Sequence, residues 1–224
     1  MFRTLVYMVC LGLFFHVQIS ACEYTLDPNH ASVTFKARHM MVANVNGEFK
    51  DFSTELCWQP DNIEKSYING TIQVASINTD HKTRDGHLRS PQFFDSDTYP
   101  SIEFKSGLIK KGSIGPDGAV IDTENIFEHV LCGELTIKDV THPNFCMTLL
   151  SFGPIVNQGI ERVGFEAMGM INRFDFNISW NKLMDQGFPV VSEDIFFVIT
   201  AESYKMLEPD DSVGQKNTES PPSS

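Results

Sequence analysis

Ionisable side chains gather in one short stretch, Arg84-Asp85-Gly86-His87, in which His87 could serve as a general base beside a carboxylate. Charged residues on a short helix, however, more often cap it, pair with neighbours or orient them. Neither a nucleophile-elbow motif nor a Ser, His and Asp triad order accompanies the stretch. We therefore predict a protein without catalytic residues. The alternative is an enzyme that acts on a small apolar substrate inside the fold, and a polar pair deep in the interior would favour it.

The histidines do not predict a metal site. Zinc-binding helices place two histidines on one face, as in His-Glu-x-x-His, and this spacing is absent. His81 and His87 are six positions apart, which puts their rings on different faces of a helix. His30 and His39 add no such spacing. We predict solvated or hydrogen-bonded histidines, no metal and no cofactor.

Strands must position these side chains, because apolar and polar residues alternate along about eight segments. In one of them, Val33, Phe35 and Ala37 alternate with polar neighbours. Turn-forming residues separate several segments, which predicts an all-β fold, either a sandwich or a closed up-and-down barrel. Glycines within the strands would help a sheet bend at a barrel corner. The segments are 32–38, 45–58, 68–74, 102–108, 131–137, 145–149, 163–167 and 195–199.

Only one segment predicts a helix. Asp80 can cap a short helix that runs to Leu88 and ends at Ser90-Pro91. A hairpin excursion with little strand character spans residues 112–125.

The N-terminus has the features of a secretory signal peptide. Arg3 precedes an apolar stretch from Leu5 to Val17, and the small residues Ser20 and Ala21 follow. We predict that residues 1–21 are removed and that the protein is exported to the periplasm. The alternative is a buried first helix or strand.

The cleavage site leaves two alternatives open. Ile19-Ser20-Ala21-Cys22 resembles the lipobox of bacterial lipoproteins, in which the cysteine is acylated and anchors the protein to a membrane. Ordinary cleavage near Ala21 would instead leave Cys22 as a plain thiol in a soluble protein. The first strand begins about two residues later, which leaves little tether for an anchor.

Charge argues against nucleic acid as a partner. The chain has 17 Lys and Arg against 29 Asp and Glu, and loss of Arg3 with the signal leaves 16 against 29. A surface with this acidic excess repels phosphate backbones. From Glu208 to the end almost every residue is polar, Pro or Gly, so the tail 208–224 is predicted to be disordered.

The cysteines predict neither a zinc knuckle nor a thioredoxin-like motif, because no Cys-x-x-Cys pair exists. Cys132 and Cys146 fall on consecutive predicted strands. A turn centred near Val140 and Thr141 would put them on opposite faces, so we predict two small buried apolar residues rather than a bridge.

Four blocks of sequence resemble the bacterial YceI-like family, which comprises lipocalin-like, polyisoprenoid-binding proteins. Their order and spacing match from Tyr24 to about Tyr204. Two departures stand out: Asn177 and Asp139 occupy positions where the family usually has glycine, and both residue types tolerate a left-handed backbone. The blocks are 24–35 with His39 and 45–49; 79–106; 133–141; and 172–176.

This resemblance implies an eight-stranded antiparallel lipocalin-like barrel with one short helix, spanning residues 22–207. Its lumen would hold a polyprenyl chain, such as that of an isoprenoid quinone or a polyprenyl phosphate, for storage or transport. Periplasmic location and homodimers are usual in the family. A further alternative is a barrel with a filled core that serves in adhesion or stress, with the acidic tail as its contact.

Apolar residues on the inward faces would contact the lipid chain. They are Phe35, Phe49, Ile72, Phe104, Leu135, Phe165 and Phe197.

Four polar residues are candidates for the head of the ligand. Arg84 or Arg173 could meet a phosphate or quinone oxygen at the mouth, and His39 and Thr79 are lesser candidates. For Arg173 the competing prediction is a partly buried ion pair with Asp175 that closes one barrel end, since residues two apart on a strand share a face.

Overall fold

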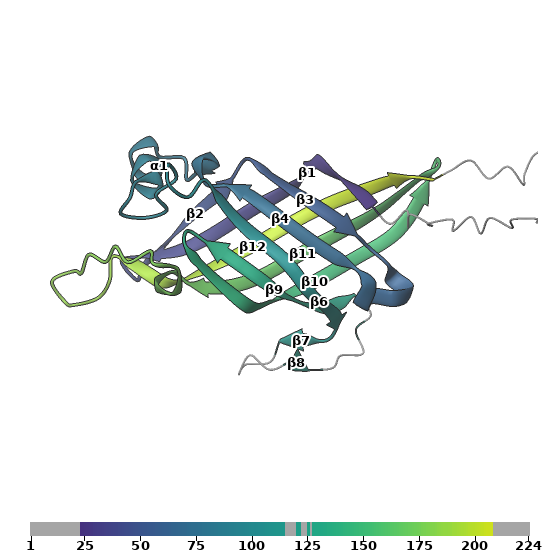
Figure 1. Cartoon of the computed structure of the whole chain (residues 1–224). Coiled ribbons are helices and arrows are strands. Elements are labelled where there is room, and N and C mark those ends of the chain that lie inside the picture. The colour runs from purple at the N-terminus through teal and green to yellow at the C-terminus, as the bar shows by residue number, and fades with distance from the viewer. Residues whose placement is uncertain (1–22, 115–119, 122–124, 126, 208–224) are drawn as a thin grey trace, which may run out of the picture.

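Antiparallel strands wrap into a closed barrel in the computed structural model, which describes residues 23–114, 120–121, 125 and 127–207 (Figure 1). β2 and β3 are two halves of one wall strand, interrupted at Lys50 and Asp51, and β12 pairs with β1 to close the wall of eight strands. The predicted eight-stranded antiparallel barrel is confirmed. The wall consists of β1 (Glu23–His39), β2 (Ala43–Phe49), β3 (Phe52–Cys57), β4 (Tyr67–Gln73), β6 (Ser101–Lys111), β9 (Glu128–Ile137), β10 (Val140–Asn157), β11 (Ile160–Asn172) and β12 (Val191–Met206).

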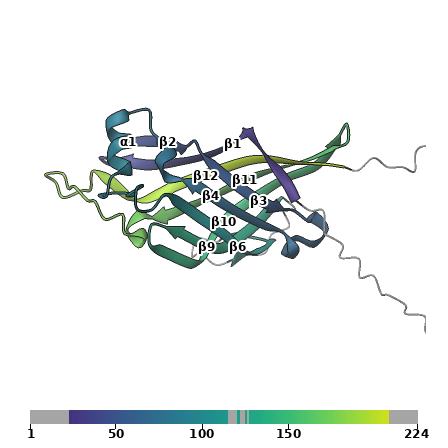
Figure 2. The same cartoon turned by 45° about the horizontal axis from the view of Figure 1, so that its top comes forward.

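Shorter elements connect the wall strands. α1 lies at the same end of the barrel as the β11–β12 connection in both views (Figures 1 and 2). No helix within the described residues has the length and apolarity needed to cross a bilayer. The predicted excursion contains one small ladder, between β7 and β8. These elements are η1 (Pro60–Lys65), η2 (Val74–Ser76), β5 (Ile77–Asn78), α1 (Lys82–Arg89), β7 (Ser113–Ile114), β8 (Val120–Ile121) and η3 (Arg173–Phe176).

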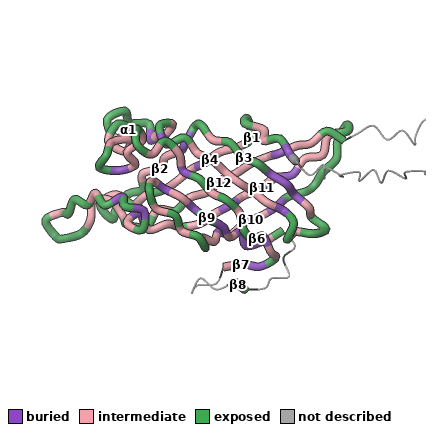
Figure 3. Tube along the Cα trace, viewed as in Figure 1, coloured by how far each residue is buried: buried purple, intermediate pink, exposed green. Residues whose placement is uncertain are grey.

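Buried and more exposed positions alternate along the wall, as Figure 3 shows. On β9, Leu135 and Ile137 are buried whereas Glu134 is exposed, because successive side chains of a strand point to opposite faces. A two-residue turn joins β10 to β11, and both of its residues, Gln158 and Gly159, have positive φ (52° and 75°). Turns of this kind match the twist of antiparallel strands.

Two buried clusters occupy the two ends of the barrel. The first includes Tyr24 and Trp58, which are 5% and 3% exposed. The second surrounds Phe93, Phe176 and Ile178, on the side of α1 and the β11–β12 connection. Members of both clusters also face the space inside the barrel.

The helix begins one residue later than predicted. His81, not Asp80, is the N-cap of α1, and its Nδ1 accepts from the backbone N–H of Arg84 at 3.3 Å. Asp80 is left-handed (φ 58°), whereas an N-cap residue takes an extended backbone.

Cys132 on β9 and Cys146 on β10 form a disulfide, with their Cα atoms 4.1 Å apart. The prediction that the two lie on opposite faces is therefore wrong. They are direct cross-strand partners, so their side chains share one face.

Two features of the β9–β10 hairpin explain this correction. The turn falls at residues 138–139, two positions earlier than predicted, with Lys138 rather than Asp139 in the left-handed region (φ 56°). A bulge between residues 142 and 145 then adds one residue to β10. A shift of one residue moves every later side chain to the other face, which brings Cys146 opposite Cys132.

Three predictions fall outside the described residues: the signal peptide 1–21, lipidation at Cys22 and the disordered tail 208–224. They stay predictions.

Candidate functional site

A cavity runs along the inside of the barrel, and residues of both buried clusters line it. Its volume is ≈ 200 Å³. On β12 its lining runs from Ile195 to Ser203, about 26 Å of strand at 3.3 Å per residue. The residues that line it are apolar except for glycine, serine and threonine, and none of them is ionisable.

All seven apolar residues predicted to face inward line this cavity: Phe35, Phe49, Ile72, Phe104, Leu135, Phe165 and Phe197. The alternation of each strand therefore assigned the inward face correctly at these positions. Contact with a ligand is a separate matter and remains a prediction.

Two of the inward phenylalanines lie against a glycine of the neighbouring strand. Phe35 pairs with Gly47 across β1 and β2, and Phe197 pairs with Gly169 across β12 and β11. A Cβ at Gly47 would lie 2.2 Å from Cζ of Phe35, and one at Gly169 would lie 2.7 Å from Cζ of Phe197. Glycine at these positions lets each ring approach the backbone of the wall, which leaves the middle of the barrel open.

Hydroxyl groups are the polar side chains of the lining, and several already have partners. The Thr34 hydroxyl donates to the Val198 carbonyl at 3.0 Å, and the Thr54 hydroxyl donates to the Asn69 carbonyl at 2.9 Å. These two bonds satisfy their hydroxyls within the wall, whereas the buried hydroxyl of Ser203, also in the lining, has no hydrogen-bond partner among the described residues. Because the lining has no ionisable side chain, the cavity is suited to an apolar molecule.

Arg84 and Thr79 hold α1 in place and do not line the cavity. Arg84 donates through Nε to the Thr79 hydroxyl and through Nη2 to the Thr79 carbonyl, both at 2.7 Å. The buried Asp85 carboxylate accepts from the Thr79 hydroxyl and from its N–H. The network caps and orients the helix, which is the role expected of charged residues there.

Arg173 is buried and bonds the backbone of the β11–β12 connection. Its guanidinium donates to the carbonyls of Ser192 at 3.0 Å and of Ile178 and Trp180, each at 2.7 Å. The predicted ion pair with Asp175 is wrong. Both residues lie on the 3-10 turn η3, not on a strand, so they share no face, and Asp175 is exposed.

The turn after Arg173 ends at Asn177, which is left-handed (φ 57°). Asparagine tolerates this conformation better than most residues do, as predicted for this position.

His39 lies at the end of β1, half-buried, opposite Val191 and Ala43. It does not line the cavity. The fold therefore brings the four polar candidates together only in pairs: Arg84 bonds Thr79, and Arg173 and His39 both lie beside Val191. None of the four lines the cavity.

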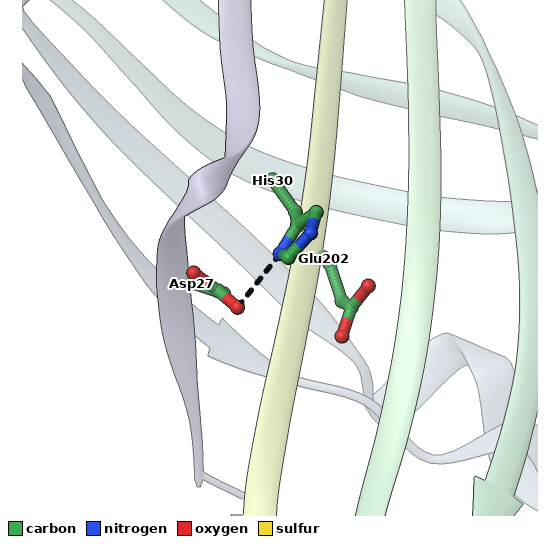
Figure 4. A group of neighbouring side chains, drawn as sticks. All are labelled: Asp27, His30 and Glu202. Carbon is green, nitrogen blue, oxygen red and sulfur yellow. Dashed lines mark hydrogen bonds and ion pairs between the residues drawn. The ribbon is translucent and has the colours of Figure 1, made fainter.

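One acidic and histidine cluster forms on the outside of the wall within the described residues: Asp27, His30 and Glu202 (Figure 4). His30 Nδ1 lies 2.9 Å from Asp27 Oδ2, and this hydrogen bond lowers the pKa of Asp27 and raises that of His30. The side chain of His30 is 65% exposed. The pair joins the two ends of a bulge in β1.

The cavity also has lining residues that were not singled out as ligand contacts, among them Phe52, Phe94, Phe145 and Met147. Phe145 and Met147 belong to an alternating segment that the sequence shows, so the same parity argument could have found them. Phe94 follows α1 in a turn, where alternation gives no signal.

The sequence of the chain matches a known protein family. The family model of the YceI-like domain matches residues 24–203. Protein YceI of Shigella flexneri is 34% identical over 165 residues, which cover 70% of this chain and 77% of that protein.

Solved structures have the same fold. A YCEI protein of Campylobacter jejuni is 26% identical with a TM-score of 0.60, covering 75% of this chain and 89% of that one. A polyisoprenoid binding domain from Saccharophagus degradans, implicated in plant cell wall breakdown, is 13% identical with a TM-score of 0.54. That match covers 82% of this chain and 98% of that one.

Proposed function

Because the chain belongs to the YceI-like family, we propose that it is an exported binding protein that holds an isoprenoid lipid in its barrel for storage or transport. The observation that carries this proposal is the apolar cavity, whose lining residues include no ionisable side chain. The likeness to a polyisoprenoid binding domain supports the choice of ligand class.

Apolar burial would supply most of the affinity. Each Å² of apolar surface removed from water contributes about 25 cal/mol, so a long chain inside the barrel gains free energy along its whole length. Branched and unsaturated chains suit a lining of aromatic rings and β-branched residues such as Phe104, Ile72 and Ile199. Polar groups then fix orientation rather than strength.

Catalysis is not part of the proposal. General acid–base chemistry needs a group of suitable pKa within hydrogen-bonding reach of the substrate, and the lining offers only serine and threonine hydroxyls. Among the described residues that line the cavity, no ionisable pair of the kind that would favour an enzyme is present.

Export is supported by the Cys132–Cys146 disulfide, because disulfides form and persist in oxidising compartments such as the periplasm. We propose removal of residues 1–21, with Cys22 as the first mature residue. Intact-mass measurement on protein from the native host would show this loss, and an added diacylglycerol and acyl group would identify a membrane anchor. An uncleaved N-terminus would contradict export.

The acidic segment 208–224 is proposed to be a disordered tail. Truncation after Leu207 should leave the melting temperature and lipid binding unchanged, because a polar segment buries too little surface to order itself. A clear drop in melting temperature would show that the tail packs on the barrel.

Mass spectrometry of bound lipid tests the function directly. Protein purified from its native host is extracted with organic solvent, and the extract is compared with that of an unrelated exported protein. We expect an isoprenoid lipid in near-stoichiometric amount. An empty protein, or one loaded with straight-chain fatty acids alone, would contradict the proposal.

A further inference from the structure

Buried aromatic side chains lie at both ends of the barrel, so a route to the cavity through either end would pass through packed side chains. At one end Trp58 packs edge-on against Phe165, with ring centroids 4.8 Å apart, and Tyr24 is also buried. At the other end Phe93 and Phe176 are 5% and 2% exposed. A ligand that entered through either end would have to move these aromatic side chains.

The side of the barrel is interrupted between β1 and the β2–β3 strand. β1 pairs with β2 from Val33 to His39 and with β3 only at residues 23–24. Among the described strands, no ladder joins β1 residues 25–32 to residues 50–55. Over this length β1 therefore has no ladder of backbone hydrogen bonds to the β2–β3 strand.

β1 bends outward at the same place, as its course in Figures 1 and 2 shows. Asp27 pairs with Glu202 on β12, and Ala31 pairs with the next residue, Ala201, so three residues of β1 have no partner in that ladder. Asp27 holds the bulge: its carboxylate accepts from the N–H of Asn29 at 2.9 Å and bonds the ring of His30.

A second pocket of ≈ 360 Å³ lies at this interruption. Leu26, Phe49 and Phe52 line both the pocket and the central cavity, so the two spaces meet at these side chains. At this pocket the apolar interior therefore approaches the solvent through the side of the wall.

Its outer rim carries charge, unlike the cavity. Glu48, Lys50 and Asp51 line it. The Lys50 ammonium lies 2.7 Å from the Glu48 carboxylate, so the cation of the rim is paired. The remaining carboxylate, Asp51, would repel a phosphate but would accept a hydrogen bond from a hydroxyl.

We propose that the lipid enters and leaves through this side opening, and that its polar head, which carries no negative charge, stays there while the apolar chain fills the cavity. The inference rests on the proposed function and narrows it: a phosphate-headed polyprenyl lipid fits the rim poorly, whereas a hydroxyl or carbonyl head fits it.

Retinol, a fluorescent isoprenoid alcohol, and retinyl phosphate are suitable probes. Stopped-flow mixing gives the rate of uptake, and titration gives the affinity. Ala31→Trp adds bulk at the opening, and Ala43→Trp, at an exposed position of β2 away from both pockets, is the matched control. We expect wild type to bind retinol about ten-fold or more tightly than retinyl phosphate, and Ala31→Trp alone to take up retinol at least about ten-fold more slowly.

A charge variant keeps the test decisive even if Ala31→Trp fails to fold. Asp51 is exposed, so Asp51→Asn should leave the fold intact. It should improve the affinity for retinyl phosphate relative to retinol by a few-fold, whereas Asp61→Asn, on η1 at the end of the barrel that holds Trp58, should not change the ratio.

The outcomes separate the two proposals. Failure of wild type to bind retinol would overturn the proposed function. Normal retinol binding with equal uptake rates in the two tryptophan variants would overturn the side entrance alone. A preference for retinyl phosphate, or no difference between Asp51→Asn and Asp61→Asn, would overturn the proposed position and charge of the head.

Discussion

Adding one methyl group at Gly47 should test whether the inner wall is packed as described. The new Cβ of Gly47→Ala would lie 2.2 Å from Cζ of Phe35, well inside van der Waals contact. Phe35 would have to leave its rotamer and turn into the cavity. Overpacking of this kind destabilises a protein by about 1–3 kcal/mol. For a domain of this size we expect the melting temperature to fall by about 2–4 °C per kcal/mol.

Gly70→Ala is the matched control. Gly70 also lies in a wall strand and lines the cavity, but a Cβ there would meet nothing within 4 Å. Where the backbone accepts alanine, the loss of unfolded-state entropy stabilises by about 0.4–1 kcal/mol. The two variants should therefore change stability in opposite directions in urea denaturation followed by circular dichroism.

A second substitution tests whether the loss of stability in Gly47→Ala comes from contact with the ring of Phe35. In a Gly47→Ala background, Phe35→Leu removes the atoms that the methyl group meets. The double variant should then be less destabilised than the sum of the two single changes, by about 0.5–3 kcal/mol. Additive effects, or a Gly47→Ala protein as stable as Gly70→Ala, would refute the packing of Phe35 on Gly47. Retinol affinity should fall in Gly47→Ala alone, because the displaced ring occupies the cavity.

Three further predictions concern the cavity, the disulfide and pH. Phe165→Trp should reduce co-purified lipid while the barrel stays folded, since Phe165 lines the cavity; unchanged lipid content by mass spectrometry would contradict its inward position. Replacing Cys132 and Cys146 together by serine should lower the free energy of unfolding by about 3 kcal/mol for a closed loop of this length, and an effect near zero in urea titrations would argue against the bridge. Burial lowers the pKa of His129, so its imidazole is protonated at a lower pH in the folded barrel than in the unfolded chain, where it takes up a proton near pH 6.5. The contribution of His129 is therefore fully favourable above about pH 6.5 and is lost as the pH falls from there towards the folded pKa. His129→Leu should flatten the fall in stability between pH 7.5 and 5.5 relative to wild type, and parallel curves would exclude the effect.

Alternation along the strands predicted the inner wall because it is a local property. Phe104 and Leu135 lie on different strands, yet each faces inward for the same reason: its neighbours in sequence are polar or small and point the other way. No knowledge of pairing is needed for this step. The lining at these positions could therefore be predicted from alternation. Alternation left a sandwich and a barrel open, and the resemblance to the YceI-like family favoured the barrel.

Pairing between strands could not be predicted in the same way. The bulge after His142 shifts β10 by one residue, and nothing in the alternation of β9 signals it. The prediction for Cys132 and Cys146 failed at this step, although both strands were placed correctly. The predicted roles of the polar side chains failed for a related reason. Arg84 and Arg173 donate hydrogen bonds to backbone carbonyls whose positions depend on turns.

The interrupted pairing between β1 and β3 also leaves a short free strand edge. Such edges are templates for pairing with a strand of another molecule. Here the edge is poorly suited to it. Pro28 in the bulge has no N–H to donate, and Lys50, Asp51 and Glu55 place charge along the opposite side. β proteins use charged, bulged and interrupted edges to avoid edge-to-edge pairing and aggregation. The barrel can thus keep an opening in its side at high concentration without joining its neighbours there, and a homodimer, where one forms, would be expected to use another face.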